Sequence, residues 1–179
     1  MNIKRVALLS MLAAGCRPAG PANADSPSAA DSAFAGVQTR GRAVMGVDQY
    51  TSQHVFEQLP SGGRVVLDRA DSLDAAGITA IREHMRDVAG DFRVGDFTKP
   101  FAVHAQQVPG TGVMRTKQAR IKYDVVDRPR GAEIRISTTD PEAVAAVHAF
   151  LAFQRSDHRA SNAEGRAGHA GHSGHAEAP

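Results

Sequence analysis

The chain has 179 residues, with 21 Lys and Arg against 19 Asp and Glu, a formal net charge of +2, a single Cys and no Trp. This length accommodates one domain of ordinary size but not two large ones. The nearly balanced charge disfavours nucleic-acid binding, and a single Cys excludes an internal disulfide, a CxxC redox pair and a Cys-rich zinc site. No apolar run reaches the ~18 residues that a membrane-spanning helix requires.

The first residues have the build of an export signal. Lys4 and Arg5 precede an apolar stretch over residues 6–12, and small residues then lead to Cys16. Small residues ahead of a lone Cys resemble a bacterial lipobox, so the sequence predicts a signal peptide over residues 1–16 and lipidation of Cys16. We expect a lipid anchor in the outer membrane, facing the periplasm. The alternative is ordinary cleavage after Ala24, which would give a soluble periplasmic protein.

Residues 17–44 and 160–179 flank the part of the chain with a globular composition. Both segments are rich in small residues and have no apolar period, so neither is expected to bury a core. We interpret residues 17–44 as a disordered tether and residues 160–179 as a disordered tail. The tail carries His169, His172 and His175 in a Gly-rich context. Several of these imidazoles can reach one transition-metal ion together.

Residues 45–159 are predicted to form one domain with an internal repeat. Strands are expected at 55–59 and 64–69, and again at 121–126 and 132–138, with Pro- and Gly-containing turns at 60–63 and 128–131. One helix is expected to begin near residues 72–74, capped by Asp71 or Ser72, and a second at Asp140. The first helix has an apolar stripe formed by Ile78, Ile81, Met85, Val88 and Phe92.

This order of elements predicts an α+β fold. Two ββα units give a four-stranded antiparallel sheet with both helices on one face. The other face is expected to be solvated or to pair with a second copy. The connection over residues 93–120 is unusually long, which favours a functional or mobile loop.

Five more histidines lie within the domain: His54, His84, His104, His148 and His158. His158 falls on the same helical face as Leu151 and Gln154, and a change from apolar to polar along one face is typical of a pocket wall. Imidazole together with thioether suits copper, especially Cu(I). We therefore predict a transition-metal site, copper first and zinc as the alternative, with His84, His104, Met114 and His158 as core ligands and the tail as an auxiliary site. A structural or exposed role is the alternative for each.

Motifs for catalysis are missing from the sequence. It contains no GxSxG, Walker loop, GxGxxG turn or paired-carboxylate motif. Asp157 and His158 are adjacent on a helix and point about 100° apart, so they do not readily pair. An enzyme is thus the least supported class.

Several short segments resemble a group of small exported bacterial proteins of unsettled function. They cover residues 45–52 (MGVDQYTS), 54–57 (HVFE), 95–97 (GDF), 108–111 (VPGT), 140–143 (DPEA) and 150–154 (FLAFQ), together with Met114. Members of this group are often labelled aspartate carbamoyltransferase. The carbamoyl-phosphate site of that enzyme has a Ser-Thr-Arg-Thr run and a His-Pro-x-Gln loop, and this chain contains neither. The resemblance therefore implies export and no catalytic residues.

Together these features predict a lipid-anchored binding module of the cell envelope, with copper as the leading ligand. The first alternative is a protein-interaction module that uses the free sheet face or an edge strand, with an envelope protein or a second copy of the chain as partner. The second alternative is a small enzyme of unknown reaction.

Overall fold

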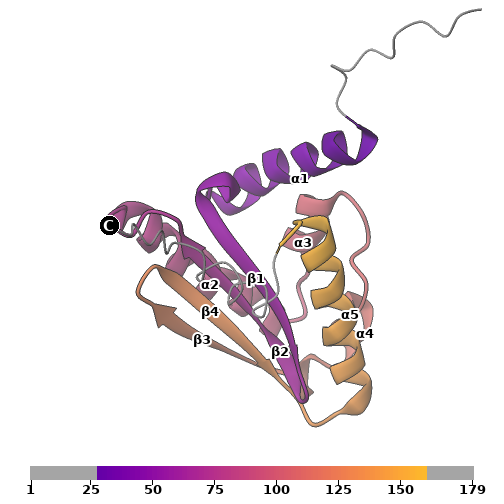
Figure 1. Ribbon diagram of the computed structural model, residues 1–179. Helices are drawn as coiled ribbons and strands as arrows, with labels where there is room; N and C mark the ends of the chain where they lie inside the picture. Colours follow the sequence, from indigo (N-terminus) through magenta and orange to yellow (C-terminus); the bar gives the residue numbers. More distant parts are fainter. Residues whose placement is uncertain (1–27, 161–179) are drawn as a thin grey trace, which may run out of the picture.

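The computed structural model describes residues 28–160, and a four-stranded antiparallel sheet lies at its centre (Figure 1). The elements in chain order are α1 (Ala29–Met45), η1 (Gln49–Thr51), β1 (Ser52–Leu59), β2 (Gly62–Arg69), α2 (Ala75–Arg93), α3 (Thr98–His104), α4 (Thr111–Thr116), η2 (Gln118–Arg120), β3 (Lys122–Arg128), β4 (Gly131–Ser137) and α5 (Pro141–Asp157). The expected signal peptide, Cys16 and the tail histidines lie outside the described residues.

Both predicted hairpins form. Leu59 pairs with Gly62 and Arg128 pairs with Gly131, so each hairpin has a two-residue loop that contains Pro. The hairpins join through their inner strands, β2 and β4, to give the order β1-β2-β4-β3 with every neighbouring pair antiparallel. The predicted α+β class and sheet are therefore confirmed.

Glycine is required where the two hairpins meet. Gly62 begins β2 with φ +140°, and a Cβ there would lie 2.2 Å from the carbonyl oxygen of Ile136. Gly131 begins β4, and its Cβ would lie 1.9 Å from the carbonyl oxygen of Leu67. The two glycines occupy equivalent places, as two ββα units would have them. An origin of the fold by duplication stays a prediction.

Helices α2 and α5 pack on the same face of the sheet. Gly63, Ile136 and Tyr123 form one cross-strand row, so their positions share a face. A Cβ on Gly63 would meet Leu151 of α5, and the Tyr123 ring lies 5.7 Å from that of Phe92 in α2. Both helices therefore contact this row, as predicted.

The starts of these two helices follow from capping. Asp140 accepts hydrogen bonds from the backbone N–H groups of Glu142 and Ala143, with Pro141 in the first turn of α5. The cap of α2 is Asp74, which accepts from Gly77, rather than the expected Asp71 or Ser72. Asp71 instead accepts from the Leu73 N–H in the preceding turn.

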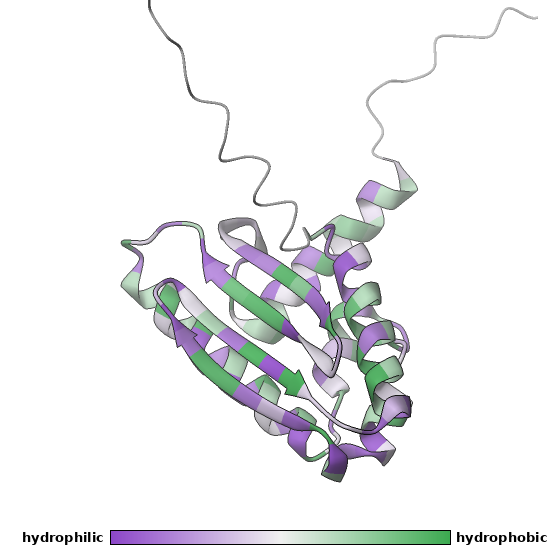
Figure 2. Cartoon of the chain, turned by 60° about the horizontal axis from the view of Figure 1, so that its bottom comes forward, coloured by the Kyte–Doolittle hydropathy of each residue, from purple (hydrophilic) through white to green (hydrophobic). Residues whose placement is uncertain are grey.

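The opposite face of the sheet carries charged side chains. Glu133 is buried there, with Arg64, Arg128 and Arg135 within ion-pair distance, and Arg128 also pairs with Asp68. Figure 2 shows hydrophobic and hydrophilic residues alternating along the strands. This period of two gives the sheet an apolar face toward the helices and an opposite face on which charged side chains lie beside the buried Val55 and Val66.

Residues 29–45 form α1, where the sequence analysis expected a disordered tether. Ser28 caps the helix by accepting from the Asp31 N–H, and Gly46 ends it in the left-handed conformation. Val37, Gln38 and Gly41 are buried, and Arg40 donates to the Val103 carbonyl at the end of α3. A tertiary contact therefore orders a segment whose composition predicts none.

The connection over residues 93–120 is also structured. It contains α3, α4 and η2, and it buries Phe97, Val103, Val108 and Met114. The expectation of a long loop was therefore wrong, because a few apolar residues without helical period pack against the ends of α2 and α5. None of the helices within residues 28–160 has the length and apolar character needed to cross a bilayer.

Candidate functional site

A cavity of about 80 Å³ lies between α2 and α5 above the sheet. Val65, Leu67, Ile134 and Ile136 form its floor, and aliphatic and aromatic side chains cover most of its wall. The remaining lining side chains carry nitrogen, oxygen or sulfur: Met45, His54, His84, Met85, Lys99, His104 and Gln154. The cavity is thus apolar with a few heteroatoms at defined places, which is typical of ligand sites.

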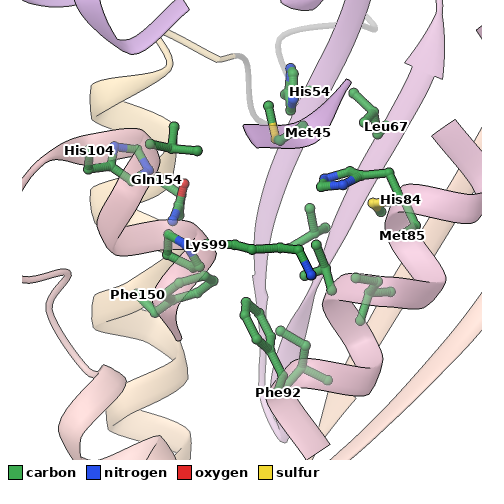
Figure 3. A pocket seen from close by; sticks show the side chains of 16 residues that line it. Met45, His54, Leu67, His84, Met85, Phe92, Lys99, His104, Phe150 and Gln154 are labelled. Atoms are coloured by element: carbon green, nitrogen blue, oxygen red, sulfur yellow. Dashed lines mark hydrogen bonds between the residues drawn. The ribbon is translucent and has the colours of Figure 1, made fainter. Parts of the chain in front are cut away.

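Five elements position these heteroatoms, as Figure 3 shows. Met45 comes from the end of α1 and His54 from β1, while His84 and Met85 come from α2. His104 and Gln154 project from α3 and α5 on the other side of the cavity. Helices α1 and α3 therefore bring Met45, Lys99 and His104 to the same cavity as residues of the sheet, α2 and α5.

The imidazoles of His54 and His84 are held neutral by burial. Loss of solvent lowers the pKa of each from 6.5 to about 4. The neighbouring His84 further lowers the pKa of His54, and the Lys99 ammonium further lowers that of His84. Each ring keeps a nitrogen lone pair at neutral pH, as a metal ligand or hydrogen-bond acceptor must.

Within residues 28–160, the ring nitrogens of His54 and His84 make no hydrogen bond to the protein. Those of His104 and His148 do, and His158 also has a partner. Both side chains, His54 and His84, are half-buried, so their ring nitrogens are open to a partner that enters the cavity. A guest that bonds to these nitrogens would be such a partner.

His104 is different because both of its ring nitrogens are engaged. Nδ1 donates to the Asp157 carboxylate, and Nε2 lies 2.9 Å from Oε1 of Gln154. Its side chain is only 1% exposed. This network joins α3 to the last turn of α5 and gives His104 a structural role.

A ring stack borders the cavity at the end of α5. The His158 ring lies 5.1 Å from His54, 5.1 Å from His104 and 5.5 Å from Phe56. Burial lowers the pKa of His158 to about 2, so this ring too is neutral. The stack fixes the orientation of His54 against α5.

Lys99 extends along the cavity from α3 and forms an ion pair with Asp91 of α2 (Figure 3). The carboxylate offsets the charge of the ammonium. Because the pair joins α3 to α2, it ties the two sides of the cavity together.

The structure brings together some of the predicted ligands and not others. His84 and His104 line the cavity, and His158 contacts His54 and His104 beside it. Met114 is fully buried in the hydrophobic core and does not line the cavity. Asp157, which the sequence analysis considered beside His158, pairs with His104.

Sequence reasoning missed Met45 and His54. His54 stands two residues before Phe56 on β1, so the period of two places it on the helix-covered face, and this signal was available. Met45 is the first residue of the predicted domain and belongs to the segment 45–52 that carries the family resemblance, but nothing in the sequence marked it as a site residue.

Within the described part of the chain, no group of three or more His, Cys, Asp or Glu side chains is arranged to hold a metal ion. Comparisons of the chain with protein-family models, with curated proteins and with solved structures gave no match.

Proposed function

We propose that the chain is an exported binding module that takes a small guest into the cavity between α2 and α5. The observation that carries this proposal is the pair of unbonded, neutral imidazoles, His54 and His84, facing an apolar cavity. A volume of about 80 Å³ exceeds the roughly 10–15 Å³ that one water molecule needs in the same measure. The cavity therefore has room for a small guest, and its mostly apolar lining favours a guest that is weakly hydrated.

Export and lipid anchoring at Cys16 are part of the same proposal. They rest on the basic, apolar and small residues of positions 1–16. A tether from the anchor would enter the domain through α1, whose last residue, Met45, lines the cavity.

The two alternative functions have less support. On the sheet face opposite the helices, the ion pairs of Glu133 and Asp68 lie beside Val55 and Val66, which are buried and do not form the exposed apolar patch that an interaction module would use. For an enzyme, the His104–Asp157 pair resembles an acid-base pair, but the second nitrogen of His104 is engaged with Gln154.

Xenon is a suitable first probe, because it enters small apolar cavities without needing polar partners. We expect xenon to shift the NMR signals of the Met45 and Met85 ε-methyl groups and to leave that of Met114 unchanged. Val88 lines the cavity and is half-buried, so Val88→Phe should abolish the shifts. Val125 is half-buried in β3 outside the cavity, and Val125→Phe is the matched control. Equal shifts at Met114, or shifts that survive Val88→Phe, would contradict the proposal.

A further inference from the structure

The donor atoms around the cavity belong to a restricted chemical class. His54 and His84 offer imidazole nitrogen, and Met45 and Met85 offer thioether sulfur. The lining contains no Asp, Glu or Cys. Zn²⁺ sites are usually completed by thiolate, carboxylate or several imidazoles, and Ca²⁺ and Mg²⁺ need oxygen ligands. Thioether with imidazole is a donor set that suits Cu(I).

The charge of the surroundings also favours a monovalent ion. The cavity is apolar, and an uncompensated divalent charge in such surroundings is strongly disfavoured. The one cation in the lining, Lys99, is paired with Asp91. A single positive charge is therefore tolerated best, and Cu(I) brings only one.

Two of the ligands predicted from the sequence, His104 and Met114, are not available to bind an ion in the cavity. Both ring nitrogens of His104 are engaged, and Met114 lies in the core away from the cavity. A donor set of two imidazoles and two thioethers also contains fewer than three His, Cys, Asp or Glu residues, which is consistent with the absence of such a group among residues 28–160.

We propose that the cavity is a Cu(I) site in which His54 and His84 supply nitrogen ligands and Met45 and Met85 supply sulfur ligands. This inference rests on the proposed binding function and names its guest. Because α1 carries Met45, binding would fasten α1 to the sheet and to α2.

The test measures Cu(I) affinity by competition with the chelator bicinchoninate under anaerobic conditions. The protein is the full chain with His169, His172 and His175 replaced by Ala, which removes the tail as a competing site. We expect one tightly bound Cu(I) per chain. Met45→Leu and Met85→Leu should each weaken binding by at least about 10- to 100-fold, because loss of a hydrogen-bonding partner outside the ligand set already has an effect of that size.

Met114→Leu is the matched control, because it is the same exchange at a buried methionine outside the cavity. Met→Leu conserves volume, and thermal unfolding checks that each variant is folded. His84→Gln tests a nitrogen ligand at a half-buried helix position, and His54→Gln tests the other. X-ray absorption of the Cu(I) complex should show nitrogen and sulfur neighbours, with less sulfur in the Met45 and Met85 variants only.

Several outcomes would overturn the copper assignment. These are cavity variants that bind like Met114→Leu, Cu(I) binding that disappears with the tail histidines, and preferential binding of Zn(II). If Cu(I) fails to bind while xenon still enters the cavity, the copper inference fails and the binding module stands. If neither enters, both proposals fail.

Discussion

His104 shows how one side chain can hold two elements together. It is buried between α3 and α5, with the Asp157 carboxylate on one nitrogen and the Gln154 amide on the other. His104→Leu removes both hydrogen bonds and leaves Gln154 buried without its partner. We expect a loss of about 3 kcal/mol in the free energy of unfolding, measured by urea denaturation.

His148→Leu is the matched control for this change. His148 bonds through Nε2 to the Leu59 carbonyl at 2.9 Å in an exposed setting. Its loss should therefore cost less than about 1 kcal/mol. Equal losses in the two variants would show that the His104 network is not structural.

The neutral histidines predict how stability depends on pH. The pKa values of His54 and His84 are lowered to about 4, whereas the unfolded chain protonates these groups near 6.5. A lowered pKa means that protons bind the unfolded state more tightly, so the stability from these groups is complete above pH 6.5 and is lost as pH falls toward 4.

We therefore expect the urea midpoint of the metal-free chain to be highest above about pH 7 and to fall between about pH 6.5 and 5. His158, with its pKa lowered to about 2, acts in the same direction. His84→Gln and His54→Gln should each make this fall shallower. An unchanged slope in both variants would contradict the assignment.

Among the elements, α5 depends most clearly on its first residue. Asp140 accepts from two backbone N–H groups of α5 and is also bonded by Lys117, and these bonds hold the pKa of its carboxyl below the usual range. Asp140→Ala leaves the helix N-terminus uncapped, so we expect a loss of about 2 kcal/mol by chemical denaturation.

Asp71→Ala provides the comparison for the cap. Asp71 is exposed and accepts from one N–H, that of Leu73, outside any helix. Its replacement should change the free energy of unfolding by no more than about 0.5 kcal/mol. A similar loss in both variants would mean that the cap contributes nothing specific.

For the whole molecule, the sequence predicts attachment to the cell envelope through a lipid on Cys16. Cys16 is the single cysteine of the chain, so any thioester- or thioether-linked lipid must be on it. We expect the full chain, expressed in a Gram-negative host, to incorporate an alkyne-labelled fatty acid and to fractionate with the outer membrane. Cys16→Ala should lose both properties. A mature protein that begins at Asp25 without lipid would support cleavage after Ala24 instead.

Local patterns in the sequence were sufficient for most of the framework. The hairpins follow from alternating residues around Pro- and Gly-containing turns, and α5 follows from Asp140 and Pro141. The placement of both helices on one face follows from the need to bury the apolar face of each element. The hairpins and the helix start depend on short-range rules, so they can be read from neighbouring residues, whereas the pairing of β2 with β4 joins distant segments and was not predicted.

Long-range packing decided the rest. Helix α1 is ordered by contact with α3, and the short helices of residues 98–116 are ordered by the ends of α2 and α5, so their own composition predicts neither. The cavity joins Met45, His54, His84 and Met85 from three separate elements. The sequence determined which donor types the chain possesses, while only the tertiary structure decided that His104 bonds to Asp157 and that His54 and His84 line one cavity. Spacing along a chain does not specify which side chains converge when the elements between them fold back on one another.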